Sequence, residues 1–235
     1  NYQDHHIDIF DLQTRTIVET IDLGEHTRPH GIQWLTDGRI IASTEGNQSI
    51  VEIAADRTVT GIKTNEVGTH MVETSPDGTR AYTANLGAGS ISLIDLNTDQ
   101  LIKTVAAGAG TEGIDLTPDG TELWISNREA NTVIDYDATT LAELDTLSVG
   151  RFPLRLQISP DGRFAVATHP SGDGISVVDL TTFELIAFIP TGSMPNYAAF
   201  GSDPEIVYVS NGGNGTISEV DLGRGIVRRN LVAGV

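Results

Sequence analysis

Three segments of the chain superimpose without a gap. They start at residues 75, 117 and 159, which are 42 apart, and each opens on a Ser- or Thr-Pro-Asp-Gly turn. A unit this short, built of four strand-like runs, cannot bury both faces of its own small sheet, so it must stack on copies of itself. The repeat therefore predicts an all-β chain, a β-propeller of four-stranded antiparallel blades.

Each repeat reads as four short strands separated by turns. An apolar run such as GIDLT precedes the Asp-Gly turn and a β-rich run such as AYTAN follows it, which is the pattern of a hairpin. The third strand alternates, as in ISLID, and the fourth ends at a glycine that can take the positive φ needed to turn back. The turn aspartates, spaced by 40, 42, 42 and 42 residues, are Asp37, Asp77, Asp119, Asp161 and Asp203.

The first residues match only the outer half of a repeat. IDIFD and TIVETIDLG correspond to a third and a fourth strand, and no first or second strand precedes them. Because an unpaired strand edge promotes aggregation, we expect the natural protein to be longer than this chain. We expect one propeller domain over residues 1–235, with half a blade at 1–24 and five blades at 25–68, 69–108, 109–150, 151–192 and 193–235.

The second strands carry a recognisable motif. AYTAN, LWISN and VYVSN each follow a Pro-Asp-Gly or Ser-Asp-Pro turn, and the chain resembles the YVTN β-propeller repeat family of bacterial and archaeal surface and periplasmic proteins. The runs IIASTEGN and VATHPSG depart from the motif and leave the fold prediction intact. The resemblance implies a seven-bladed natural protein in the periplasm or at the cell surface, and it implies little about activity.

Composition excludes several classes of function. Asp and Glu number 32 against 14 Lys and Arg, a formal charge of −18 that disfavours nucleic-acid binding. The acidic surface fits either a solubilising coat or adaptation to salt. Cysteine is absent, which excludes disulfides and thiolate metal sites. No apolar run approaches the roughly 18 residues of a membrane span, and the polar start does not read as a signal peptide.

One column of the repeat is chemically unusual. The position seven residues before each turn aspartate precedes the first strand, at the expected mouth of the central channel. Its first three members are His30, His70 and Glu112. Two imidazoles and a carboxylate on successive repeats are a plausible set of ligands for zinc or another divalent metal. Histidine at a strand start is also often a hydrogen-bonded channel residue, and no short motif such as HExxH supports a metal. The column reads His30, His70, Glu112, Leu154, Asn196.

Two further residues are candidates for binding a cofactor or ligand at the same mouth. Arg155 follows the column and can present a guanidinium to an anionic ligand, and Asn196 belongs to the column itself. Other repeated columns are interpreted as scaffold. Alternate positions along the same strands are apolar and expected in the core: Ile32, Val72, Ile114, Leu156, Trp34, Leu116, Ile158 and Phe200. We expect inter-blade hydrogen bonds from the row Gln33, Glu73, Asp115, Gln157. Loop capping is expected from the column Glu45, Asn85, Asn127, His169, Asn211.

Three functions remain open from the sequence. The first is a non-catalytic propeller that binds a metal ion, a small polar ligand or a protein partner at the axial mouth. The second is a metal-dependent lactonase or carbon–oxygen lyase that uses the same His, His and Glu ring, with a histidine moving a proton. The third is a structural protein of a surface layer. No nucleotide-binding fingerprint or nucleophile elbow is present.

Overall fold

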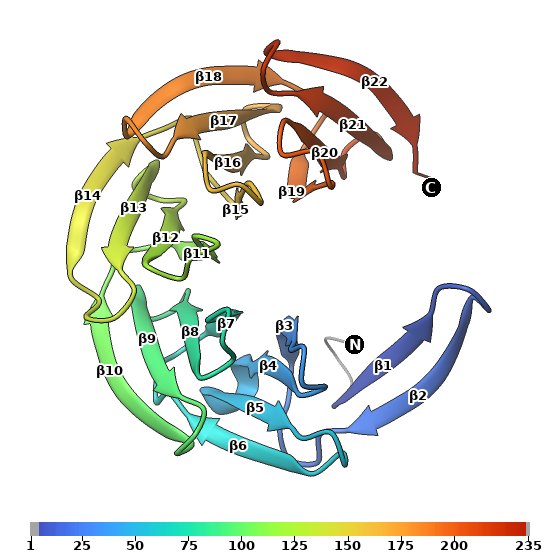
Figure 1. Ribbon diagram of the computed structural model, residues 1–235, viewed down its shortest axis with the longest axis vertical. Coiled ribbons are helices and arrows are strands. Elements are labelled where there is room, and N and C mark those ends of the chain that lie inside the picture. Colours follow the sequence, from blue (N-terminus) through green and yellow to red (C-terminus); the bar gives the residue numbers. More distant parts are fainter. Residues whose placement is uncertain (1–4, 234–235) are drawn as a thin grey trace. The chain divides into compact units, whose positions relative to one another are not determined.

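The computed structural model describes residues 5–233, and these residues form antiparallel sheets (Figure 1). The chain divides into two compact units, Asn1–Ala106 and Ala107–Val235. The first unit holds β1 (His6–Asp11), β2 (Thr16–Asp22), β3 (Pro29–Trp34), β4 (Ile40–Thr44), the 3-10 helix η1 (Glu45–Asn47), β5 (Ser49–Ile53), β6 (Val59–Lys63), β7 (Thr69–Thr74), β8 (Arg80–Asn85), β9 (Ser90–Asp95) and β10 (Gln100–Ala106).

The second unit repeats the same plan of consecutive antiparallel strands. Its strands are β11 (Thr111–Leu116), β12 (Glu122–Asn127), β13 (Thr132–Asp137), β14 (Glu143–Ser148), β15 (Leu156–Ile158), β16 (Phe164–His169), β17 (Gly174–Asp179), β18 (Glu184–Pro190), β19 (Pro195–Phe200), β20 (Ile206–Asn211), β21 (Thr216–Asp221) and β22 (Ile226–Val232). In the described part of the chain every sheet is a meander in which neighbours in sequence are hydrogen-bonded neighbours in space.

The sheets confirm the predicted blades. Within residues 5–233 there are five four-stranded sheets and one two-stranded sheet, the latter formed by β1 and β2 alone. These match the five complete repeats and the half repeat at the start of the sequence. The fold is therefore the predicted all-β propeller, and the assignment of residues 1–235 to one domain stays a prediction.

The Asp-Gly turns are built by the aspartate side chain. Asp77 Oδ1 accepts hydrogen bonds from the hydroxyl of Ser75 at 2.6 Å, from the backbone N–H of Thr79 at 3.0 Å and from its hydroxyl at 2.8 Å. Gly78 takes a φ of 66°, in the left-handed region that glycine tolerates. The hydrogen bonds from Ser75 and Thr79 lower the pKa of Asp77, so the ionised carboxylate stabilises the turn.

The core lies between the facing sheets within each unit. In the second unit, Trp124 and Val133 of one sheet pack with Leu156 and Ile158 of the next. In the first unit, Ile41 packs in the same way with residues of β7, β8 and β9. These sheets thus bury a face against a neighbouring copy, as the short repeat requires.

Most residues expected in the core are buried, namely Val72, Ile114, Leu116, Leu156 and Ile158, but two are exposed instead. Ile32 is 50% exposed and Trp34 is 60% exposed. The sheet that packs beside β3 and β4 in the first unit contains only β1 and β2, and its buried residues Ile7 and Ile21 reach Ile40 and its neighbours. The prediction that Ile32 and Trp34 are core residues is therefore wrong, because no inner strand covers β3 on that side among the described residues.

The polar row four residues before the turns does link blades, as predicted. In the first unit, Gln33 Nε2 donates to Glu73 Oε2 at 2.7 Å. In the second unit, the backbone N–H of Ile158 donates to Asp115 Oδ2 at 2.7 Å. These side chains join the inner strands of adjacent sheets, which confirms their structural role.

Candidate functional site

The imidazoles of His30 and His70 lie against one another in the first unit. Each is the second residue of its strand, His30 in β3 and His70 in β7, and these two strands are in contact. The ring centroids are 3.8 Å apart and the ring planes are inclined by 31°. His70 is buried and His30 is half-buried. The equivalent positions of two successive repeats therefore meet, as the sequence predicted for this pair.

A carboxylate orients one of the two rings. His70 Nδ1 donates a short hydrogen bond to Glu45 Oε1, and Arg28 Nη2 lies 2.9 Å from Glu45 Oε2. The Nδ1–H group donates and the carboxylate oxygen accepts, so Nε2 of His70 is directed away from Glu45. A buried carboxylate behind an imidazole is the arrangement commonly found behind histidines that bind metals.

Glu45 was missed by sequence reasoning. It begins η1 and was assigned to the column that caps loops. A signal was present, because Glu45 is the one acidic residue in a column otherwise made of Asn and His. Its backbone N–H donates to the carbonyl oxygen of Arg28 at 3.2 Å, so one loop contact positions both members of the ion pair.

A glycine allows the two histidine-bearing strands to approach. A Cβ atom on Gly31 would lie 2.7 Å from the backbone N of Val72 and 3.0 Å from the Cα of Met71. The hydroxyl of Ser43 crosses the same gap, accepting from Gly31 N at 2.8 Å and donating to the carbonyl of His70 at 2.5 Å. The contact between the rings thus depends on the absence of a side chain next to His30.

Replacing Gly31 with Ala is expected to lower the free energy of unfolding by about 1–3 kcal/mol, because the new methyl group overpacks against the backbone of β7. The imidazole contact should be lost with it, which the NMR shifts of the two ring systems would report. Gly201 is the control, since its added Cβ would only touch the Tyr208 ring at 3.4 Å. Equal stability of the two variants would contradict the close approach of β3 and β7.

Glu112 is engaged by arginines in the second unit. It is buried at the start of β11, and its two oxygens face Arg128 Nη1 at 2.5 Å and Arg155 Nη1 at 2.6 Å. Among residues 5–233, no group of three or more His, Asp or Glu side chains is placed to hold a metal ion. The three-residue metal site of His30, His70 and Glu112 stays a prediction, and the observed contacts give Glu112 guanidinium partners.

The remaining predicted ligand residues lie in the second unit. Arg155 directly precedes β15 and points its guanidinium at Glu112, as described above. Asn196, in β19, is exposed, and its Oδ1 accepts a hydrogen bond from the hydroxyl of Ser210 at 2.6 Å. The structure thus brings Arg155 to another member of the column and pairs Asn196 with its own sheet, and the binding roles of both residues stay predictions. Arg128 was not predicted from the sequence. It directly follows β12, one position after the column that contains Asn127.

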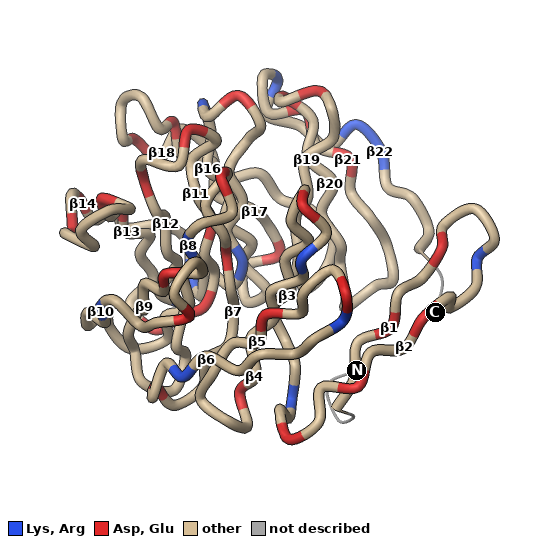
Figure 2. The backbone as a smooth tube through the Cα atoms, turned by 60° about the horizontal axis from the view of Figure 1, so that its bottom comes forward, with Lys and Arg blue, Asp and Glu red and all other residues tan. Residues whose placement is uncertain are grey.

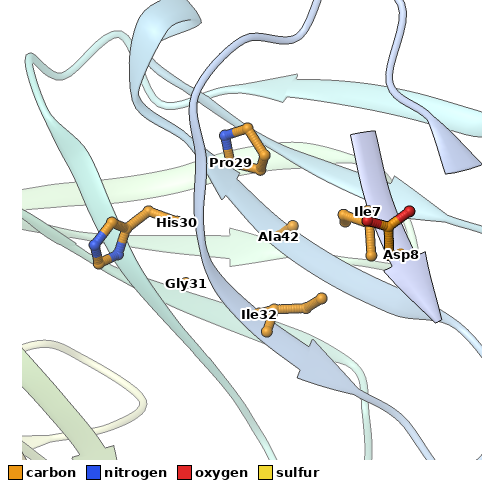
Figure 3. Close-up of a pocket in the computed structure, with 7 residues that line it drawn as sticks. All are labelled: Ile7, Asp8, Pro29, His30, Gly31, Ile32 and Ala42. Atoms are coloured by element: carbon orange, nitrogen blue, oxygen red, sulfur yellow. The ribbon is translucent and has the colours of Figure 1, made fainter. Parts of the chain in front are cut away.

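A pocket of about 250 Å³ opens beside the histidine pair without containing the rings. It lies between β1 and β3 (Figure 3). In Figure 3 the imidazole of His30 is on the opposite side of β3 from Ile7 and Asp8. The pocket is also smaller than most sites for drug-sized ligands. Its lining residues are Ile7, Asp8, Pro29, His30, Gly31, Ile32 and Ala42.

Acidic residues outnumber basic ones along both units (Figure 2). The cationic side chains near the candidate sites are Arg28 in the first unit and Arg128 and Arg155 in the second, each paired with a buried or nearly buried glutamate. In a chain of formal charge −18, these three arginines thus face two glutamates.

Residues 26–154, more than half of the chain, match the cytochrome D1 heme domain family. The chain belongs to this family. The matched segment of the cytochrome D1 heme domain contains Arg28, His30, Glu45 and His70, so the whole imidazole and carboxylate cluster falls inside it.

A solved structure supports the same fold for this chain. Hydrazine synthase of Kuenenia stuttgartiensis is 21% identical, with a TM-score of 0.75 over 88% of this chain and 67% of that chain. In all, 1525 chains of known structure match, which reflects how widely the fold occurs. At this identity the likeness shows the fold alone. No curated protein sequence matches the chain.

The comparisons refine the expected family. They support a β-propeller and a family named for heme, and they do not support the YVTN-repeat family specifically. In the described part of the chain, no helix is both long and apolar enough to cross a membrane.

Proposed function

We propose that this protein is a cofactor-binding β-propeller that holds a heme-type metal cofactor through the imidazole pair His30 and His70. The family to which it belongs is named for heme, and the family match spans both histidines. A metal-containing cofactor agrees with the ligand class expected from the sequence, whereas zinc has no support from the comparisons. Periplasmic or cell-surface location stays a prediction from the repeat resemblance.

The hydrogen bond from His70 Nδ1 to Glu45 is the observation that carries the proposal. Heme iron is commonly held by a histidine nitrogen, and metal-binding histidines usually donate their other N–H to a carboxylate or a carbonyl. His70 has this arrangement, and Arg28 pairs with the other oxygen of Glu45. The residues therefore fit the ligand requirement of a heme iron, and the bound cofactor would supply a metal centre for ligand binding or electron transfer.

The protein residues have separable tasks in this proposal. Glu45 fixes the ring plane of His70 through the hydrogen bond to Nδ1. His30 stacks on His70, which restricts rotation of both rings and places a second imidazole beside the first. Gly31 keeps the two strands close enough for this contact. The lactonase, lyase and surface-layer alternatives stay predictions, since no contact of this cluster favours them over cofactor binding.

The test is titration of the purified protein with iron protoporphyrin, followed by heme absorbance. His70→Ala is expected to weaken binding by at least tenfold and to shift the Soret band. Glu45→Gln should weaken it by about 10–100-fold, because the supporting acceptor is weakened. Free imidazole should restore the Soret position of the His70→Ala complex. His6→Ala, at a histidine on β1 that pairs with Asp8, is the matched control and should bind normally.

Two results would overturn the proposal. One is equal heme affinity in the wild type, His30→Ala and His70→Ala. The other is calorimetric binding of zinc that both histidine variants abolish, with no binding of heme. The second result would return the site to the simple metal-ion interpretation.

A further inference from the structure

The Glu112 cluster carries an excess of positive charge. One buried carboxylate, with a side chain 4% exposed, faces two guanidinium groups, so the three side chains sum to +1. This occurs in a chain of formal charge −18. A buried charge without compensation is costly, so a structural ion pair would need only one arginine. The second arginine calls for an explanation other than neutralising Glu112.

The two guanidiniums have unused hydrogen-bond donors. A guanidinium offers five N–H groups, and Arg128 and Arg155 each direct one nitrogen at Glu112. In the described structure, Nε of Arg128 is buried and has no hydrogen-bond partner. A buried donor left unsatisfied costs about 1–3 kcal/mol, which an acceptor atom from a ligand would offset. The cluster is thus short of acceptors as well as of negative charge.

The backbone is hydrogen-bonded at both arginines, and the Arg128 guanidinium also packs on an aromatic ring. The backbone N–H of Arg128 donates to the carbonyl of Gly110 at 3.0 Å, and the guanidinium carbon lies 5.2 Å from the centre of the Phe152 ring. The carbonyl of Arg155 accepts from the backbone N–H of Thr168 at 2.9 Å. The backbone N–H of Phe152 in turn donates to Asn131 Oδ1 at 2.8 Å. Preorganised donors lose little conformational entropy on binding, which favours affinity.

We propose that Arg128 and Arg155 form a binding site for a small oxyanion, of which a carboxylate is the best match. The planar guanidinium fork fits the two oxygens of a carboxylate. The side chains of Arg128 and Arg155 are 27% and 15% exposed, so solvent and small ions reach them. This site lies wholly in the second unit and does not depend on the proposed cofactor site.

The experiment is a calorimetric titration with succinate and, separately, inorganic phosphate at constant ionic strength. Arg155→Gln should weaken succinate binding at least tenfold. Glu112→Gln should strengthen it about tenfold, because the cluster then carries +2 instead of +1. Arg163→Gln is the matched control, since Arg163 also packs on an aromatic ring, 4.7 Å from the centre of Phe164, but is 55% exposed. It should leave the affinity unchanged.

The opposite response of Arg155 and Glu112 variants separates binding from folding. A general loss of structure would weaken binding in both, and melting curves of each variant would show it. Arg155→Lys keeps the charge and loses the fork, so it should reduce the preference for succinate over phosphate. Unchanged affinity in Arg155→Gln, or weaker binding by a folded Glu112→Gln variant, would overturn the proposal.

Discussion

Raising the pH from 5 to 8 is expected to remove about 4 kcal/mol that Asp115 and Asp135 contribute to the free energy of unfolding, and replacing both with Asn should remove most of that contribution. The pKa of each carboxyl is raised from 3.8 to about 7 in the folded protein. The folded state therefore holds these protons more tightly than the unfolded state does. The resulting stability is present at low pH and is lost as the pH rises through about 7.

Burial is the main cause at both positions. Asp115 is half-buried between two sheets of the second unit, and the backbone N–H groups of Ile158 and Leu116 only partly offset its loss of hydration. Asp135 is buried in β13, and the charges of Glu122 and Asp145 raise its pKa further. We expect a smaller share from Asp135, because solvent near its strand neighbours screens those charges.

Urea unfolding of the wild type, the two single variants and the double variant at pH 5, 6, 7 and 8 would measure the effect. Asp119→Asn is the control, since hydrogen bonds from Thr117 and Thr121 lower the pKa of Asp119. Its contribution is lost only as the pH falls below about 4, outside the tested range. The same slope in the double variant as in the wild type would show that Asp115 and Asp135 titrate normally.

The repeat was sufficient to predict the blades because its signals are local. The Asp77 turn needs only Ser75, Gly78 and Thr79, all within a few residues. The strand pattern then repeats wherever the turn does. Burial was harder to predict from the sequence, because the surroundings of Ile32 depend on how many strands the neighbouring sheet has. A periodic pattern describes the strand and not what covers it.

The candidate sites were predictable only in part for the same reason. The contact between His30 and His70 follows from equivalent positions in successive repeats. The side chains that contact those positions come from other segments. Glu45 belongs to η1, which follows β4, and Arg128 belongs to the loop that follows β12. Such tertiary partners decide whether a carboxylate supports an imidazole, as Glu45 does, or binds guanidiniums, as Glu112 does.

Replacing Glu112 with Ala is expected to lower the free energy of unfolding by about 3 kcal/mol, because two partly buried guanidiniums lose their common counterion. Chemical denaturation at pH 5, with succinate absent, would measure it. Adding Arg155→Met to Glu112→Ala should recover part of the loss, since one of the uncompensated charges is then removed.

A double-mutant cycle between Glu112 and Arg155 makes this expectation specific. Residues in direct contact show coupling of about 0.5–3 kcal/mol, whereas independent residues add. If Glu112 served only as a metal ligand, Glu112→Ala would leave the metal-free protein as stable as the wild type, and the cycle would be additive. A clear coupling energy would instead identify Glu112, at the start of β11, as the counterion of Arg155.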